Sequence, residues 1–360
     1  MNGIERPRRV LIVRTGAMGD VLHAMPAVAA LREAHPEWFI GWAIEPRWSE
    51  LMEAAGGRDS AAVRGPGMPL VDRWHAVETR EWKRRPISVA TAKSIGGLRR
   101  ELRAERYDVC VDMQGLIRSA VIGRMAGAVR YAGPAVSREP QARWLYGARV
   151  ERHAAHVIEQ GCELLSAAVG EALRPGRVWL PVDEAAAVWC DALLAGAAEE
   201  RFVMMAPTAG WGAKQWPVER FGAVAAELGR AGYRTLVNAS SARDEAAAQL
   251  VNASEGFATA VPCSIGQMIA LMRRAALVIA GDTGPLHMAA ALERPVVGIY
   301  GPTDPARTGP FGTRSRVLRD ASSVTNHKRL SEPETGLLRI GVGEVVVAAL
   351  ALLEENEVKG

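Results

Sequence analysis

One stretch of the sequence constrains the fold more than any other: residues 278–292, Val-Ile-Ala-Gly-Asp-Thr-Gly-Pro-Leu-His-Met-Ala-Ala-Ala-Leu. Its apolar start continues a run that begins at Ala275 and is typical of a strand covered on both faces in a parallel sheet. Residues 281–285 break the run with turn residues, and residues 286–292 resume it with helix formers. The pattern predicts a strand, a tight turn and a helix whose N-terminus is directed at one point. Such a point favours an anion, above all a phosphate.

The same turn also has a purely structural interpretation. Asp282 and Thr283 are residue types that cap helices, and Pro285 suits a first helical position. The next segment of the chain favours a binding site, because the apolar strand predicted at 295–300 leads into a second polar turn at 301–307. In an open α/β sheet the loops after parallel strands lie at one carboxyl edge, where ligands bind. We therefore expect the two adjacent loops to face one crevice.

Composition limits the class of protein. The chain has 360 residues, of which 49% are apolar and 23% charged, so it is globular and long enough for two domains. Its four cysteines are widely spaced, without a C-x-x-C pair, which indicates neither a zinc site nor a disulfide framework and fits a reducing cytoplasm. The first apolar segment, at residues 9–13, is too short for a signal peptide or a membrane span. The sequence predicts a cytoplasmic protein that can visit a membrane surface.

Positive charge is concentrated in the first half of the chain. Residues 1–175 carry 26 Lys and Arg against 20 Asp and Glu, whereas residues 176–360 carry 18 against 20. Nine basic residues and only three glutamates fall between Arg80 and Arg106, which predicts an anionic partner for the first half. A solvated helix face is the alternative for residues 99–106, where acids and bases alternate. A nucleic-acid partner is disfavoured because no reader motif accompanies the charge.

The N-terminus reads as a strand, a loop and a helix. The strand is expected at 9–13, the loop at 14–20 and the helix from Val21 to Ala34. The loop has only Gly16 and Gly19, so it is neither a dinucleotide fingerprint nor a Walker A loop. Two glycines allow the backbone to approach another group closely, and Asp20 lies where the helix begins. Asp20 is a candidate for chemistry, and a helix N-cap is its structural alternative.

The alternation continues along the chain and restarts in its second half. We expect a helix at 48–55, a loop rather than a helix at 79–86 because like charges crowd together there, and a further strand at 202–206 that begins the second half. The region 171–181 is the predicted boundary, which gives domains at 1–172 and 173–360. The fold class is therefore α/β, with two tandem, doubly wound, Rossmann-like domains facing a central cleft.

Five motifs, in order along nearly the whole chain, resemble the ADP-heptose:lipopolysaccharide heptosyltransferases, glycosyltransferase family nine. They are Thr15-Gly-Ala-Met-Gly-Asp-Val-Leu-His23, Asp112-Met-Gln-Gly-Leu-Ile-Arg-Ser119, Lys214-Gln-Trp-Pro217, Gly281-Asp-Thr-Gly-Pro-Leu-His287 and Tyr300-Gly-Pro-Thr-Asp-Pro305. The segments Arg80-Glu-Trp-Lys-Arg-Arg85 and Ser137-Arg-Glu-Pro140 look most like those of heptosyltransferase I.

The resemblance implies a GT-B architecture with an acceptor-binding N-terminal domain, a nucleotide-sugar-binding C-terminal domain, and a last helix, near 344–355, that packs back across the domains. It implies an inverting, metal-independent transfer from ADP-heptose, a substrate rather than a cofactor, to the Kdo region of lipid A, with Asp20 as general base. The enzyme would be a monomer at the inner face of the cytoplasmic membrane. A carboxylate at a helix N-terminus stays ionised at neutral pH, as a base must.

The resemblance also implies two sets of contacts. The donor-binding set is Thr208, Lys214, Asp244, Glu245, Cys263, Asp282, Thr283, Gly284, Leu286 and His287. The acceptor-binding set is Lys83, Arg84, Arg85, Arg118 and Arg143.

Some assignments stay open at the level of sequence. Thr208-Ala-Gly-Trp211 stands where the heptosyltransferase I branch tends to carry paired threonines, and either Asp244 or Glu245 could hold the ribose. Cys263 lies where the family holds the adenine. A related heptosyltransferase of the lipopolysaccharide core, or a sugar-nucleotide epimerase on the same tandem architecture, is an alternative, although an epimerase leaves Arg80 to Arg85 unexplained. The sequence does not distinguish the sugar, the nucleobase or the acceptor residue.

Overall fold

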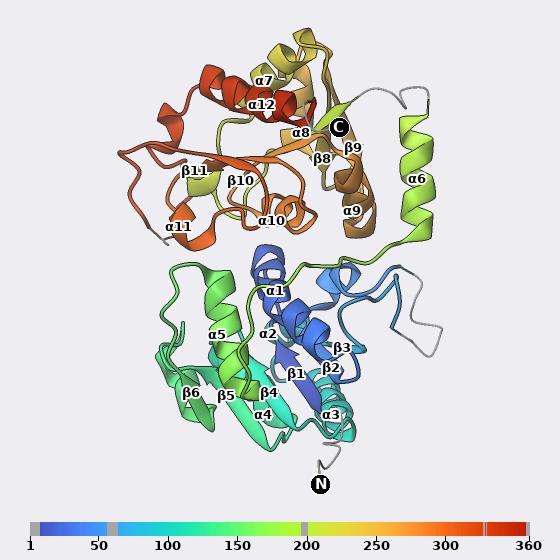
Figure 1. The fold of residues 1–360 in the computed structure, drawn as a ribbon, viewed down its shortest axis with the longest axis vertical. Coiled ribbons are helices and arrows are strands. Elements are labelled where there is room, and N and C mark those ends of the chain that lie inside the picture. Colours follow the sequence, from blue (N-terminus) through green and yellow to red (C-terminus); the bar gives the residue numbers. More distant parts are fainter. Residues whose placement is uncertain (1–7, 56–63, 196–200, 327, 329, 358–360) are drawn as a thin grey trace. The chain divides into compact units, whose positions relative to one another are not determined.

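The computed structural model describes residues 8–55, 64–195, 201–326, 328 and 330–357. Residues 1–7 lie outside the described part of the chain. They belong to the N-terminal segment for which the sequence predicts no signal peptide. Two compact units divide the chain, residues 1–181 and 182–360 (Figure 1). Each unit is a six-stranded parallel sheet with helices on both faces.

The first unit has strand order β3-β2-β1-β4-β5-β6. Helices α1 and α5 pack together on one face of the sheet, and α3 and α4 pack together on the other. Its elements are β1 (Arg9–Val13), α1 (Met18–Ala34), β2 (Phe39–Ile44), the 3₁₀ helix η1 (Pro46–Leu51), β3 (Arg73–Ala76), α2 (Thr79–Arg84), α3 (Val89–Ala104), β4 (Val109–Asp112), α4 (Ile117–Met125), β5 (Arg130–Pro134), η3 (Pro140–Leu145), β6 (Ala148–Val150) and α5 (Val157–Val169).

The second unit has strand order β12-β11-β10-β7-β8-β9, the same order as in the first unit when its strands are counted from β7. Its elements are α6 (Glu184–Leu194), β7 (Phe202–Ala206), η4 (Gly212–Lys214), α7 (Val218–Arg230), β8 (Arg234–Ala239), α8 (Glu245–Ala253), β9 (Ala258–Pro262), α9 (Ile265–Arg274), β10 (Leu277–Gly281), α10 (Gly284–Ala291), β11 (Val296–Tyr300), α11 (Pro305–Thr308), β12 (Ser315–Arg319), η5 (Leu337–Arg339) and α12 (Val342–Glu357). Both units thus have the Rossmann order, which confirms the predicted fold class.

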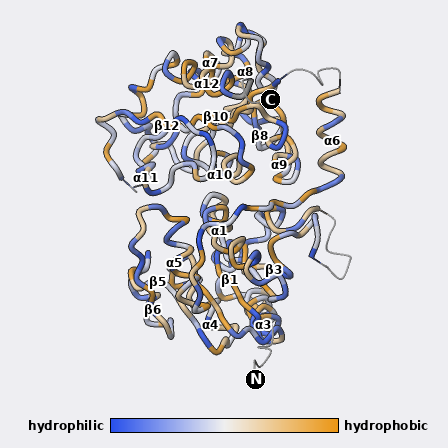
Figure 2. Tube along the Cα trace, in the orientation of Figure 1, coloured by the Kyte–Doolittle hydropathy of each residue, from blue (hydrophilic) through white to orange (hydrophobic). Residues whose placement is uncertain are grey.

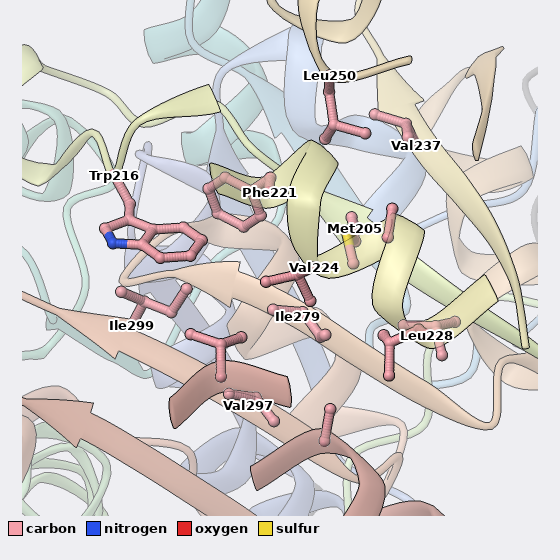
Figure 3. Close-up of a cluster of buried hydrophobic side chains, with 14 of the residues drawn as sticks. Met205, Trp216, Phe221, Val224, Leu228, Val237, Leu250, Ile279, Val297 and Ile299 are labelled. Atoms are coloured by element: carbon pink, nitrogen blue, oxygen red, sulfur yellow. The ribbon is translucent and has the colours of Figure 1, made fainter. Parts of the chain in front are cut away.

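The core of the second unit lies between the sheet and helices α7, α8 and α12. Phe221, Val224 and Leu228 of α7 lie over Ile279 of β10 and Val297 of β11 (Figure 3). Burying a side chain of this size contributes roughly 1.5–3 kcal/mol. Figure 2 shows the corresponding pattern along the chain, with β1 and β10 in the hydrophobic range of the scale. The apolar runs that predicted these strands are their buried residues.

The boundary between the units lies nine residues after the predicted one at 172/173. The extended stretch after α5 is held on the first unit, where the Gly176 N–H donates to the Pro26 carbonyl at 2.9 Å. Residue 176 thus belongs to the first unit, which extends to residue 181. Helix α12 packs on α7 and on strands β10 to β12 of the second unit. That it also crosses to the other domain stays a prediction.

Three local predictions were wrong. Helix α1 begins at Met18 rather than Val21, because Ala17 is its N-cap and Asp20 belongs to its first turn. The predicted helix at 48–55 is instead the short η1, which ends at Leu51. Residues 79–84, predicted as a loop, form helix α2.

Helix α2 forms despite its like charges because side-chain contacts hold it, two of them with residues outside the helix. Glu81 pairs with Arg84 at 2.7 Å, the Thr79 hydroxyl donates to Glu45, and the Trp82 indole donates to Ser94 Oγ at 3.0 Å. The cationic side chains themselves stay exposed to water, which screens their mutual repulsion.

Among the residues that the structure describes, no helix is long and apolar enough to cross a membrane.

Candidate functional site

Strand order determines where each unit can bind a ligand. In a doubly wound sheet the crevice lies outside the carboxyl ends of the two strands at which the order reverses. Those strands are β1 and β4 in the first unit, and β7 and β10 in the second. Asp20 follows β1, and Lys214 and Asp282 follow β7 and β10. The main predicted residues therefore lie at the switch points of their respective sheets.

Asp20 lies in the first turn of α1, with its side chain about one-third exposed. Arg14 Nη2 lies 2.9 Å from Asp20 Oδ1, and Arg138 Nη1 lies 3.4 Å from Oδ2. The Ala17 N–H also donates to the carboxylate. The N-cap position belongs to Ala17, whose side chain makes no capping bond, so the N-cap alternative for Asp20 is wrong. Asp20 is a carboxylate held between two guanidinium groups.

The pKa of Asp20 lies below its usual range. Burial by itself would raise it, but the charges of Arg14 and Arg138 and the hydrogen bonds from Ala17 and Arg14 outweigh that effect. The carboxylate is therefore ionised at neutral pH and can accept a proton. Arg138, which is 62% exposed, was not among the predicted contacts. The resemblance of Ser137-Arg-Glu-Pro140 to an acceptor-side segment was the signal that could have identified it.

A buried hydrogen-bond network connects the loops after β1 and β4. Asp112, fully buried, accepts from the backbone N–H groups of Gln114 and Gly115 and from the hydroxyls of Ser119 and Tyr146. Burial raises the pKa of Asp112 in spite of these four donors. The network connects the loop after β4 to Ser119 of α4 and to Tyr146, which follows η3.

Gln114 extends the network to the loop that precedes Asp20. Its Oε1 accepts from the Thr15 N–H at 2.8 Å and from the Thr15 hydroxyl at 2.7 Å. Arg14 donates to the Met113 carbonyl and to the Asp20 carbonyl, so it joins both loops as well. A Cβ on Gly16 would lie 2.7 Å from Trp48 Nε1, so the close neighbour that this glycine permits is an indole ring.

Gln114→Met is expected to lower kcat about tenfold with little change in the nucleotide-sugar KM. The substitution keeps the side-chain volume but leaves the buried Thr15 N–H and hydroxyl without their acceptor, at a cost of about 1–3 kcal/mol for each unsatisfied group. The loop that carries Arg14 and Asp20 would loosen as a result. Steady-state kinetics and the thermal unfolding midpoint test this. An unchanged kcat with a lower midpoint would limit Gln114 to stability.

In the second unit Lys214, Asp282 and His287 form one buried cluster. Lys214 Nζ lies 2.5 Å from Asp282 Oδ2 and 3.3 Å from the Asp282 carbonyl, and His287 Nε2 lies 3.0 Å from Asp282 Oδ1. The Asp282 and His287 side chains are 6% and 5% exposed. Lys214 Nζ also lies 4.9 Å from the centre of the Trp211 ring, within the range of a cation–π contact.

Contacts within the cluster keep the Asp282 carboxylate ionised. Burial would raise the pKa of Asp282, but the hydrogen bond from His287, the charge of His287 and the charge of Lys214 hold it well below its usual range. An ammonium group has three N–H donors, and two of those on Lys214 are directed at Asp282. The third donor can reach an anionic ligand.

The contacts at the start of α10 do not fit the hypothesis that Asp282 and Thr283 only cap this helix. Thr283 is the N-cap, but its hydroxyl donates to the Gly281 carbonyl at 3.2 Å instead of capping the helix. Gly284 is the first helical residue, and Leu286 is fully buried. The carboxylate of Asp282 is bound by Lys214 and His287, so helix capping does not explain Asp282.

The other donor candidates follow neighbouring strands of the same sheet. Thr208 is exposed after β7, and Gln215, which was not predicted, bridges the loop around it: its Oε1 accepts from the Ala209 N–H and its Nε2 donates to the Pro207 carbonyl. Cys263 follows β9 and is half-buried, and Asn238 Nδ2 lies 3.4 Å from its Sγ.

The two acidic candidates after β8 differ in what they contact. Asp244 is the N-cap of α8, where Oδ1 accepts from the Ala247 N–H and Oδ2 from the Ser240 N–H and hydroxyl. Burial would raise the pKa of Asp244, but these hydrogen bonds lower it. Glu245 is exposed in the first turn of the helix.

All five predicted acceptor contacts are exposed residues of the first unit. Lys83 and Arg84 end helix α2 and Arg85 is its C-cap, so these three are neighbours. Arg118 is on α4 and Arg143 is on η3, two elements that pack against each other.

Within the described part of the chain, no group of three or more His, Cys, Asp and Glu side chains could hold a metal ion. The charged side chains of the cluster are Lys214, Asp282 and His287. That the reaction needs no metal stays a prediction.

Comparison with known proteins assigns the chain to a family. The model of glycosyltransferase family 9 (heptosyltransferase) matches residues 95–336. Lipopolysaccharide heptosyltransferase 1 of Escherichia coli K12 is 30% identical over 326 residues, which cover 86% of this chain and 93% of that protein.

Two solved structures have a similar fold. E. coli heptosyltransferase WaaC with ADP-2-deoxy-2-fluoro heptose has a TM-score of 0.72 and 26% identity, covering 97% of this chain and 99% of that one. A glycosyl transferase of family 9 from Veillonella parvula has a TM-score of 0.81 and 22% identity, covering 98% and 100%. With five motifs in order, two Rossmann sheets and these relatives, the chain belongs to glycosyltransferase family 9, the heptosyltransferases.

Proposed function

We propose that this enzyme transfers L-glycero-D-manno-heptose from ADP-heptose to the Kdo region of lipid A, in assembly of the lipopolysaccharide inner core. The observation that carries the proposal is the pair of switch-point sites: an ionised, partly exposed Asp20 in one unit, and the Lys214–Asp282–His287 cluster in the other. A relative named lipopolysaccharide heptosyltransferase 1 and a related structure that holds an ADP-heptose analogue support this choice.

The reaction is a single displacement. The acceptor hydroxyl loses its proton to Asp20, and its oxygen bonds to the anomeric carbon of the heptose. The bond from that carbon to the diphosphate oxygen breaks, and ADP leaves with the electron pair. A carboxylate whose pKa is lowered by Arg14 is a weak base, which suits a transition state in which the leaving group departs before much proton transfer.

Lys214 stabilises the departing diphosphate. Negative charge grows on the diphosphate as the glycosidic bond breaks, so a fixed cation acts more strongly on the transition state than on the substrate. The salt bridge to Asp282 and the indole of Trp211 hold the ammonium in place before the donor binds. Backbone N–H groups at the start of α10, near Thr283 and Gly284, add further donors.

The ribose is held by Glu245 rather than Asp244. Both oxygens of Asp244 already accept hydrogen bonds at the start of α8, whereas Glu245 is exposed beside it. Cys263 and its neighbouring backbone, at the end of β9, form the edge of the adenine site. No cofactor takes part in this scheme.

Incubation of the purified enzyme with ADP-heptose and Kdo-lipid A tests the proposal. The expected result is a product heavier by one heptose in mass spectrometry, with release of one ADP. Transfer from ADP-heptose to another core acceptor only would favour a different heptosyltransferase of the family. Interconversion of nucleotide sugars without an acceptor would favour the epimerase alternative and contradict the proposal.

The acceptor is bound partly by charge. Replacing Arg84 and Arg85 with glutamine should raise the acceptor KM about tenfold and leave the ADP-heptose KM unchanged, because the lost contacts are to carboxylates and phosphates of the acceptor. The wild-type acceptor KM should rise with salt, since exposed charges are screened over about 8–10 Å at physiological ionic strength. Paired kinetics at low and high salt decide this. If the acceptor KM responds neither to the substitutions nor to salt, then Lys83, Arg84 and Arg85 form a solvated surface and do not bind the acceptor.

The enzyme acts as a monomer at the inner face of the cytoplasmic membrane, where a lipid-linked acceptor is anchored.

A further inference from the structure

The junction of α2 and α3 has an apolar tip within a cationic surface. Ile87 and Val89, at the tip, are 99% and 72% exposed. Between residues 80 and 93 there are five basic residues and one acid, and all five bases are exposed. They are Arg80, Lys83, Arg84, Arg85 and Lys93. Here the exposed apolar side chains lie directly between exposed cations.

The tip is held by hydrogen bonds and is not a loose loop. The Arg85 carbonyl accepts from the Thr91 hydroxyl at 2.7 Å and from the Ser88 N–H at 3.3 Å. Ser88 Oγ in turn accepts from the Thr91 N–H at 3.0 Å and so caps α3. Because these bonds close the turn around Ile87, its side chain projects into solvent in the folded state.

Trp82 anchors the tip to the domain. It packs against the core formed with α3 and α4, and its indole N–H donates to Ser94 Oγ. The Ser94 hydroxyl donates to Glu78 Oε2 at 3.0 Å, so Ser94 of α3 contacts both Trp82 of α2 and its N-cap residue Glu78. The Trp82 side chain thus packs against the core, whereas the smaller side chains of Ile87 and Val89 are exposed to solvent.

The same segment is connected to the loop that precedes Asp20. Glu45, buried after β2, accepts from the Thr79 hydroxyl at the start of α2, and its own N–H donates to the Thr15 carbonyl at 3.1 Å. Hydrogen bonds through Glu45 therefore connect the cationic segment to the loop of the candidate base within the first unit.

We propose that residues 80–93 form a membrane-docking surface that inserts Ile87 and Val89 into the interfacial region of an anionic bilayer. Charge complementarity selects the occupant: a bilayer rich in phosphate headgroups presents negative charge over an apolar layer, which matches cations around an apolar tip. A soluble acidic protein would match the cations but would gain little from a fully exposed isoleucine. The inference rests on the proposed function, because a lipid-linked acceptor requires the enzyme at a membrane.

Binding to vesicles without any substrate tests the surface. Vesicles of phosphatidylethanolamine with one quarter phosphatidylglycerol would be compared with neutral phosphatidylcholine vesicles by co-sedimentation. Wild type should bind the anionic vesicles more tightly. Ile87→Ser/Val89→Ser should weaken that binding about tenfold, since burial of each apolar side chain contributes roughly 1.5–3 kcal/mol when complete and less at an interface. Arg84→Gln/Arg85→Gln should weaken it about fivefold per charge.

Val129→Ser is the matched control, because Val129 is 92% exposed in the same unit outside residues 80–93. It should bind anionic vesicles as wild type does. Equal binding by wild type and Ile87→Ser/Val89→Ser would overturn the insertion of the tip. Equal binding of wild type to neutral and anionic vesicles would overturn the cationic part of the surface.

Activity separates this inference from the proposed function. With a deacylated, soluble acceptor, Ile87→Ser/Val89→Ser should keep the wild-type kcat/KM, whereas with acceptor embedded in vesicles it should fall about tenfold, in proportion to the lost binding. A loss with both acceptors would assign the tip to acceptor recognition and contradict membrane docking. Vesicle binding without any heptose transfer by wild type would reject the proposed function alone.

Discussion

Replacing Asp20 with asparagine is expected to lower kcat by about 10²–10⁴-fold while ADP affinity stays within about twofold, because a general base acts in the chemical step and not in binding the donor. Asparagine keeps the size of the side chain and removes the charge that Arg14 and Arg138 neutralise. Turnover measured beside calorimetric titration with ADP gives both quantities. A kcat within a few-fold of wild type would exclude Asp20 as the base.

Asp72→Asn provides the matched control for Asp20. Asp72 is also a salt-bridged carboxylate of the first unit, 2.5 Å from Arg32 Nη2, but it precedes β3 and accepts from the Ile40 N–H at the opposite end of the strands. The substitution should lower the thermal midpoint and leave kcat near the wild-type value. An equal loss of kcat in both variants would mean that general destabilisation, and not lost base catalysis, explains the result.

The pH dependence of kcat offers an independent test of Asp20. Its pKa in the folded enzyme is lowered by Arg14 and Arg138, so the active, ionised form should persist to below the usual range of an aspartate. The value of kcat should therefore fall only at strongly acidic pH. Removing the Arg138 charge, as in Arg138→Gln, should move this acidic limb towards higher pH.

Replacing Lys214 with methionine is expected to lower kcat/KM for ADP-heptose by about 10²–10³-fold, with contributions from both a higher donor KM and a lower kcat. The lysine contacts the diphosphate in the ground state and more strongly as charge develops on it. The variant should also be less stable by about 3 kcal/mol, because a buried carboxylate loses its cationic partner. Calorimetry with ADP, steady-state kinetics and denaturant unfolding would measure the three effects.

Two further variants separate donor binding from stability. Lys214→Met/Asp282→Asn removes both charges of the pair, so it should recover most of the lost stability but none of the donor affinity. Arg220→Met removes a cation of the same unit that donates to the carbonyls of Leu338 and Ile340 at 2.6 and 2.9 Å. It should reduce stability and leave the donor KM unchanged. Donor affinity that returns in the double variant would remove Lys214 from the diphosphate site.

The Lys214–Asp282 pair should also make stability depend on pH. The folded-state pKa of Asp282 lies well below its unfolded value of about 3.9. The contribution of the pair to the free energy of unfolding is therefore fully present above that unfolded value and is lost as pH falls through the folded pKa. Lys214→Met should show a weaker loss of stability over the same acidic range.

The sequence by itself determined the fold class and the position of most central elements. Strands β1 and β7 have the predicted bounds, and β11 differs by one residue, because each is a run of about five apolar residues bounded by polar or turn residues. Edge strands such as β6 and β12 were not predicted. Their mixed composition supplies no apolar run, and they form because a neighbouring strand pairs with them.

Helix α2 is an element that the sequence pattern wrongly predicts as a loop. Consecutive cations disfavour a helix in isolation, and the sequence pattern contains no sign of the Glu45 carboxylate or the Ser94 hydroxyl that hold Thr79 and Trp82. These contacts join residues 34 and 12 positions apart. A local pattern does not include partners at that distance, so only the folded chain could decide this element.

The sequence also determined which residue types stand at strand ends, which is why Asp20, Lys214 and Asp282 could be proposed from the pattern and the family resemblance. Only the tertiary structure decided which of them meet. Lys214 contacts Asp282 across 68 positions and Arg138 contacts Asp20 across 118. The physical reason is strand order. Pairing of β1 with β4 and of β4 with β5 brings the loops of Asp20 and Arg138 to one edge of the first sheet, and pairing of β7 with β10 does the same for Lys214 and Asp282 in the second. No local pattern encodes that pairing.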